Sequence, residues 1–210
     1  TERRNSIVKV YKLYTELLDY EPLIWRRLLV TDAMKMSNFA YALMYLYEME
    51  GEHLFNFYFP EKDMYYGIPD ESDDEIGYET VDARRKSLRD VINVVGQDII
   101  FNYDFGDNWE VAVRLEDITD PEFSHLKYPI VLEGEGYGII EDCGGVSGLE
   151  DMAEAFREKK GPNYEEYREW LGKDDIDLKT FSADHKDLRN LRAGMSFFRS
   201  IYERSQLLFV

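Results

Sequence analysis

Residues 99–116 read IIFNYDFGDNWEVAVRLE. Apolar and polar residues alternate on both sides of Gly106-Asp107-Asn108, which is the sequence signature of a β-hairpin. A three-residue turn places all eight apolar side chains on one face of the sheet, which we expect to face the core. The predicted cross-strand pairs are Phe105–Trp109, Tyr103–Val111, Phe101–Val113 and Ile99–Leu115.

The same register sets Asp104 opposite Glu110 on the other face of the hairpin, with Asp107 close by in the turn. Like charges directly opposite each other destabilise a sheet. Three answers to this repulsion stay open: solvation, a metal ion, or ion pairs with Arg26, Arg27 or Arg114.

Composition and charge limit the classes of function. The chain has 210 residues, of which 44% are hydrophobic and 15% aromatic, enough for a sizeable core. Its net charge of −18 repels phosphate groups, so we expect no direct binding to nucleic acid or to an anionic membrane. The single cysteine, Cys143, fits a reducing compartment, and the start TERRNS lacks the apolar core of a signal peptide. A cytoplasmic location is therefore expected.

The hydrophobic pattern outside the hairpin predicts further strands and helices. In the predicted strand 23–30, Ile24, Arg26, Leu28 and Val30 share one face. Residues 69–82 hold seven carboxylates and no basic residue, which is typical of a solvated loop. The expected strands are 7–18, 23–30, 53–59 and 130–132, and the expected helices are 37–50, 83–93, 149–159, 163–171 and one beyond Asp184.

The last predicted helix carries an apolar stripe at heptad-like spacing. Two interpretations stay open: the stripe packs on its own domain, or it forms the seam of a dimer through the C-terminal helix. The stripe consists of Leu188, Leu191, Met195, Phe198 and Tyr202.

The glycine-rich stretch 134–148, GEGYGIIEDCGGVSG, matches no catalytic motif. It is not GxGxxG, and its acidic residues would repel a phosphate. Ser147 lacks the glycine two residues later that a nucleophile elbow requires, so we expect Ser147 to cap the following helix. Gly144-Gly145 should include a residue with positive φ. The scattered His53, His125 and His185 argue against a structural zinc site.

Several blocks of the chain, taken together, resemble the plasmid pRiA4b ORF-3-like family. They are YDFGDNWE at 103–110, GEG at 134–136, EDCGG at 141–145 with Gly148, PLIWRR at 22–27, HLFNF at 53–57 and WLG at 170–172. The resemblance covers about residues 7–181. Val111 departs from the family's usual His, Ile139-Ile140 from its Pro-Pro, and an extra Cys near Gly138 is missing.

The resemblance implies a single α+β domain with a largely antiparallel sheet and packed helices, at residues 1–181. A C-terminal helical extension would follow at 182–210. Similar proteins occur on plasmids and as passengers of insertion elements, without an established chemistry.

We expect a non-catalytic binding or accessory domain, associated with mobile genetic elements and needing no cofactor. Its partner would be a basic protein or a small ligand. We further expect the hairpin turn and the glycine-rich stretch to meet on one surface, with Trp109 as its floor. The binding face would consist of Asp104, Asp107, Trp109, Glu141 and Asp142.

Two alternatives stay open. A metal-dependent hydrolase would hold a divalent metal through oxygen ligands, which hard cations prefer. Nucleic-acid processing is favoured only by the genomic association. The metal ligands of the hydrolase would be Asp104, Asp107, Glu141, Asp142 and His53.

Overall fold

Eight strands form one sheet in the order β5-β4-β3-β6-β7-β1-β2-β8. The computed structural model describes residues 7–69, 79–119 and 125–204. Neighbouring strands are antiparallel except β4 and β5, so the predicted α+β class with a largely antiparallel sheet is confirmed. The strands are β1 (Val10–Leu17), β2 (Trp25–Thr31), β3 (Phe55–Phe59), β4 (Met64–Gly67), β5 (Thr80–Asp82), β6 (Asp98–Tyr103), β7 (Trp109–Thr119) and β8 (Ile130–Glu135).

Strands β6 and β7 form the predicted hairpin with a different register. Tyr103, not Phe105, lies opposite Trp109, and Asn102, not Asp104, lies opposite Glu110. The turn takes residues 104–108 because Asp104 and Asn108 both adopt left-handed backbone angles, with φ of 55° and 53°. The pairing shifts by two residues, so each strand residue stays on the face of the sheet that the alternation predicted. The apolar side chains of both strands are therefore buried as expected. Phe105 is the exception, because it lies in the turn and is 44% exposed.

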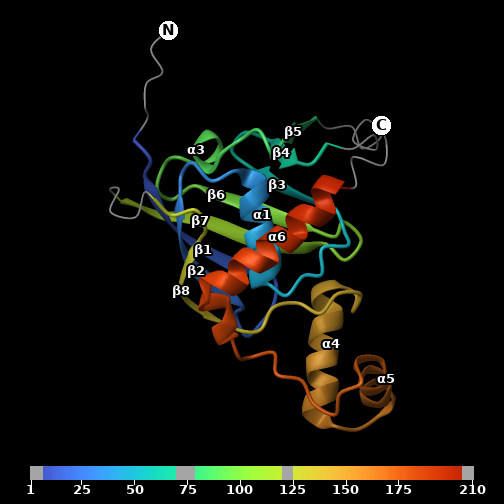
Figure 1. The fold of residues 1–210 in the computed structure, drawn as a ribbon. Coiled ribbons are helices and arrows are strands. Elements are labelled where there is room, and N and C mark those ends of the chain that lie inside the picture. Colours follow the sequence, from blue (N-terminus) through green and yellow to red (C-terminus); the bar gives the residue numbers. More distant parts are fainter. Residues whose placement is uncertain (1–6, 70–78, 120–124, 205–210) are drawn as a thin grey trace.

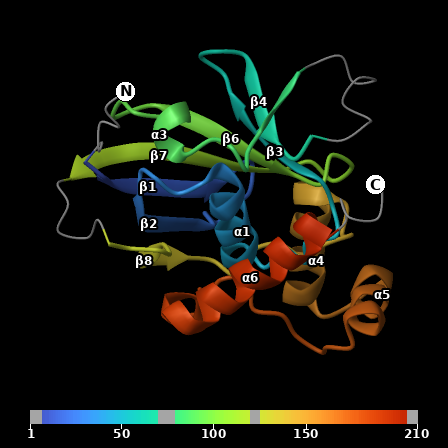
Figure 2. The same ribbon diagram turned by 45° about the horizontal axis from the view of Figure 1, so that its top comes forward.

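Two stacked helices cover one face of the sheet (Figures 1 and 2). Helix α1 (Met36–Leu46) is buried along most of its length, and its Phe39 stacks on Phe57 of β3. Helix α6 (Leu188–Arg204) packs on α1, where Gly194 allows the two helices to approach closely. The buried members of the apolar stripe therefore pack on their own domain, and a dimer through the C-terminal helix stays a prediction. The buried members are Leu191, Met195, Phe198 and Tyr202.

Helices α4 (Gly145–Glu158) and α5 (Pro162–Leu171) form a hairpin at one end of the molecule (Figure 1). Helix α4 begins earlier than predicted, because Gly144 takes the N-cap position. Ser147 lies inside the first turn, where its hydroxyl donates to the Gly144 carbonyl, so the predicted cap is wrong. The predicted positive φ is confirmed at both glycines, with 93° at Gly144 and 70° at Gly145.

The remaining helices are short. Helix α3 (Leu88–Val91) replaces the longer helix predicted at 83–93, and the 3₁₀ helix η2 (Ala183–Lys186) precedes α6. Residues 70–78 of the acidic segment lie outside the described residues. The division at residues 181 and 182 stays a prediction. Within the described ranges, no helix has the length and apolar character needed to cross a bilayer.

Candidate functional site

The hairpin turn and the glycine-rich stretch meet, as predicted. The Asp107 carboxylate accepts a hydrogen bond of 3.2 Å from the Gly144 amide. A Cβ atom at Gly145 would lie 2.4 Å from the Asp107 carbonyl oxygen, so only glycine fits this position without displacing the backbone. Asp107 therefore fixes the start of α4 against the hairpin.

Glu141 links the same region to the segment that follows α1. Its Oε1 atom accepts hydrogen bonds from the Tyr103 hydroxyl at 2.5 Å and from the Glu50 amide at 2.6 Å. The Tyr103 oxygen in turn accepts from the Gly51 amide at 2.9 Å. Burial, together with the bond to Glu141, raises the pKa of Tyr103 well above its ordinary value. This tyrosine therefore stays a neutral donor.

His53 is the basic side chain that faces the carboxylates. Its Nε2 atom lies 3.6 Å from Asp104, 3.7 Å from Glu141 and 3.8 Å from Asp142. Arg27 pairs with Glu116 and Glu133 instead, and Arg114 pairs with Asp98. Among the described residues, no ion pair joins Arg26, Arg27 or Arg114 to Asp104, Glu141 or Asp142. The observed register also removes the expected opposition of Asp104 and Glu110.

The five residues of the predicted binding face differ in their accessibility. Trp109 is fully buried, and Asp104 and Glu141 are each only 8% exposed. Asp107 is engaged with Gly144, whereas the Asp142 side chain is 76% exposed. Trp109 therefore cannot contact a partner directly, and Asp142 is the member that reaches solvent.

The predicted metal ligands come together only in part. Among the residues that the structure describes, no group of three or more His, Cys, Asp or Glu side chains is placed to hold a metal ion. Asp107 points to a backbone amide rather than to His53. This geometry does not favour the metal-dependent hydrolase, which stays an untested alternative.

Arg26, which the sequence analysis offered as an ion-pair partner of the carboxylates, has a structural role instead. It is fully buried, and its guanidinium donates to the carbonyls of Leu46, Glu135 and Tyr137 at 3.1, 2.6 and 2.6 Å. Burial lowers the pKa of Arg26 to about 10. Arg26 thus holds the end of α1 against the loop that follows β8.

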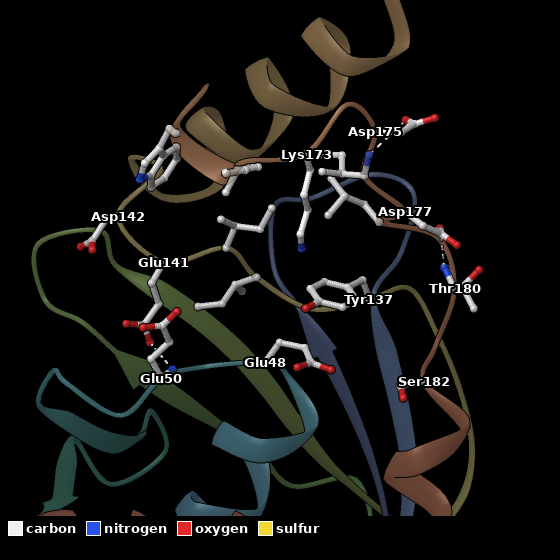
Figure 3. A pocket seen from close by; sticks show the side chains of 16 residues that line it. Glu48, Glu50, Tyr137, Glu141, Asp142, Lys173, Asp175, Asp177, Thr180 and Ser182 are labelled. Atoms are coloured by element: carbon white, nitrogen blue, oxygen red, sulfur yellow. Dashed lines mark hydrogen bonds between the residues drawn. The ribbon is translucent and has the colours of Figure 1, made fainter. Parts of the chain in front are cut away.

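A groove of about 720 Å³ opens beside this loop (Figure 3). Its walls are the turn that follows α1, the loop after β8, the end of α5 and the segment 173–182. The Gly136 and Tyr137 amides donate to the carbonyls of Lys179 and Leu178, which fixes that segment in place. The groove is lined by Glu48, Glu50, Tyr137, Ile139, Ile140, Glu141, Asp142, Trp170, Leu171, Lys173, Asp175, Ile176, Asp177, Leu178, Thr180 and Ser182.

The lining combines negative charge with apolar surface. Six carboxylates line the groove against one basic residue, Lys173. Figure 3 shows the Lys173 side chain extending between the walls toward Tyr137. Trp170, from the WLG block, is 47% exposed at the groove. Sequence reasoning missed the groove because its walls are far apart in the chain.

Comparison with known proteins gives consistent matches. The model of the family described as plasmid pRiA4b ORF-3-like protein matches residues 9–187. The uncharacterized protein y4hQ of Sinorhizobium fredii (strain NBRC 101917 / NGR234) is 31% identical to this chain over 190 residues. The matched residues make up 89% of this chain and 94% of y4hQ. The crystal structure of a protein of unknown function, MM3350 from Methanosarcina mazei Go1, superposes with a TM-score of 0.74 at 30% identity. The superposition covers 87% of this chain and 99% of the Methanosarcina mazei chain.

Proposed function

The chain belongs to the plasmid pRiA4b ORF-3-like family, and we propose that it is a non-catalytic binding domain whose groove receives a basic segment of a partner protein. One observation carries the proposal: six carboxylates and an exposed tryptophan line the same cavity. Cytoplasmic location and an accessory role beside mobile elements stay predictions of the sequence and of the family resemblance.

Charge supports a cationic partner. Glu50 and Asp142 are exposed at the groove, where a cation can reach them without breaking the contacts that hold the fold. Complementary charges steer a partner toward the groove and select against partners of the same sign. The groove already holds one cation of the chain itself, since Lys173 extends into it.

The apolar lining supports a partner that is amphipathic. Trp170 offers a ring on which a guanidinium or ammonium group can lie, and aromatic faces attract such cations. Apolar side chains beside it, such as Ile140 and Ile176, suit an aliphatic anchor. A short segment that mixes arginine or lysine with leucine matches both features.

A peptide-binding experiment tests the proposal. A labelled peptide that alternates arginine with leucine should bind in a fluorescence-polarisation titration, and a glutamate–leucine peptide should not. Glu50→Gln/Asp142→Asn should weaken binding about tenfold, which corresponds to about 1.4 kcal/mol. Lys173→Gln should strengthen binding by removing a like charge from the groove.

The matched control is Glu79→Gln, which neutralises an exposed carboxylate directly before β5. Strand β5 is the edge of the sheet opposite to β8, beside which the groove opens. It should leave the affinity unchanged. Equal binding of the acidic peptide, or equal losses in the groove variant and in Glu79→Gln, would exclude the groove as the binding site.

A small amine is the second candidate ligand, because the groove volume lies in the range of small-molecule pockets, about 300–1,000 Å³. Spermidine should then displace the labelled peptide at concentrations that leave the protein folded. If sodium chloride of equal ionic strength displaces the peptide equally well, the effect of spermidine is charge screening and not binding in the groove.

A further inference from the structure

The segment from η2 into the first turns of α6 carries three basic residues, Lys186, Arg189 and Arg192, against the carboxylates Asp184 and Asp187, in contrast to the strongly acidic chain as a whole. Helix α6 contains four arginines and one glutamate, whereas the net charge of the chain is −18. Lys186 and Arg192 are both exposed. Within the described part of the chain, no carboxylate lies within 4.0 Å of either cationic group. Lys186 lies over the Phe181 ring and Arg192 over the Tyr128 ring, at 5.8 and 5.9 Å, and both side chains stay exposed to a partner on their other side.

The acidic groove lies next to this segment. Ser182 lines the groove and directly precedes η2, which ends at Lys186, and α6 begins two residues later at Leu188. The molecule thus presents complementary charges side by side. It also presents apolar side chains at both places, since Leu188 and Phe197 of α6 are 48% and 56% exposed and Trp170 is exposed at the groove.

We propose that the basic segment bound by the groove is the α6 surface of a second copy of this chain, in a two-fold dimer. The inference rests on the proposed function and names its partner. In a two-fold arrangement each copy offers the same two patches, so the contact of Lys186 and Arg192 with the partner copy's groove forms twice. The two contacts reinforce each other because the patches are neighbours on each molecule.

The charged pairs determine how the dimer responds to salt. The attraction between exposed charges decays over a screening length of about 10 Å at 0.1 M salt and about 3 Å at 1 M salt. The dimer should therefore dissociate as salt rises. Its two-fold geometry also allows a charge-swap experiment, because reversing one patch can be compensated by reversing the other.

Sedimentation equilibrium of the full chain tests the dimer. Two variants change one patch each: Lys186→Glu/Arg192→Glu reverses the two exposed cations at the start of α6, and Glu50→Lys/Asp142→Lys reverses two exposed carboxylates of the groove. Each alone should raise the dimer dissociation constant at least tenfold, and an equimolar mixture should form a mixed dimer. Arg85→Glu, an exposed arginine at the β5 end of the sheet, is the matched control and should dimerise normally.

The outcomes separate this inference from the proposed function. A wild-type monomer at every concentration, or variants that dimerise as well as the wild type, overturns the dimer. If the arginine–leucine peptide still binds, the groove keeps its proposed function with another partner. If neither dimer nor peptide binding is found, both proposals fail. Unchanged circular dichroism of each variant confirms that a lost dimer is not lost folding.

Discussion

The Tyr103 hydroxyl and the Glu141 carboxylate, 38 residues apart in the chain, are joined by a hydrogen bond of 2.5 Å in the interior. Tyr103 ends strand β6 and also lies opposite Trp109, the first residue of β7. Glu141 also accepts from the Glu50 amide, in the segment that follows α1. This bond therefore ties the hairpin, the glycine-rich stretch and the segment after α1 together.

Removing this hydroxyl tests its contribution to stability. Tyr103→Phe should lower the free energy of unfolding by about 1–3 kcal/mol, because it leaves a buried carboxylate oxygen and the Gly51 amide without this partner. Urea unfolding followed by circular dichroism measures the loss. Tyr58→Phe removes a hydroxyl that bonds to Asp63 at the surface and should cost less than about 0.5 kcal/mol. Equal losses would contradict a special role for Tyr103.

The contact of Gly145 with Asp107 predicts a difference between two neighbouring glycines. Alanine at either position is strained by a positive φ, at about 1–2 kcal/mol. At Gly144 a Cβ atom meets open space, whereas at Gly145 it meets the Asp107 backbone. Gly145→Ala should therefore be the more destabilising change, measured as the shift of the thermal midpoint. A larger shift for Gly144→Ala would mean that the hairpin and α4 are not packed as described.

The observed hairpin register predicts opposite outcomes for two aromatic residues. Trp109→Ala should cost about 3–5 kcal/mol, because the indole is fully buried. Phe105→Ala should cost less than about 1 kcal/mol, because the ring lies partly exposed in the turn. Denaturant unfolding of both variants distinguishes the registers, since pairing of Phe105 with Trp109 would make both changes costly.

Buried phenols predict a loss of stability at alkaline pH. Burial raises the pKa of Tyr47, Tyr103 and Tyr202 above their ordinary value of 10.0. A group whose pKa is raised by folding stabilises the native state below its unfolded pKa, and this contribution is lost as pH rises above it. Unfolding free energies should therefore fall above about pH 10. Tyr103→Phe should reduce the slope, and an unchanged slope would exclude this tyrosine as a cause.

Metal titration tests the hydrolase alternative. Because no described group of side chains is placed to hold a metal, micromolar Mn²⁺ or Ca²⁺ should raise the thermal midpoint by less than about 1 °C. A ligand that binds only the native state must stabilise it. A rise of several degrees that disappears in Asp104→Asn would favour the metal-dependent hydrolase over the binding domain.

Several features follow from local sequence. The alternation in residues 99–116 determined the hairpin and which of its side chains face the core, and this assignment survived a change of register. Side chains alternate with a period of two, so a shift by two residues keeps every strand residue on its face. The alternation in residues 23–30 placed Arg26 on one face with Ile24, Leu28 and Val30, and only the structure shows that this face is buried. The glycine pair predicted the left-handed turn before α4.

The register and the site depended on tertiary structure. The alternation is compatible with several turn lengths, so it does not determine which residues pair across the hairpin. The left-handed backbone angles of Asp104 and Asn108 set the turn at residues 104–108. Whether Glu141 is buried and Asp142 exposed depends on Tyr103 and His53, which are distant in sequence. The groove exists only because Arg26 and the segment 173–182 bring four separate parts of the chain together, and hydrophobic periodicity carries no information about such long-range contacts.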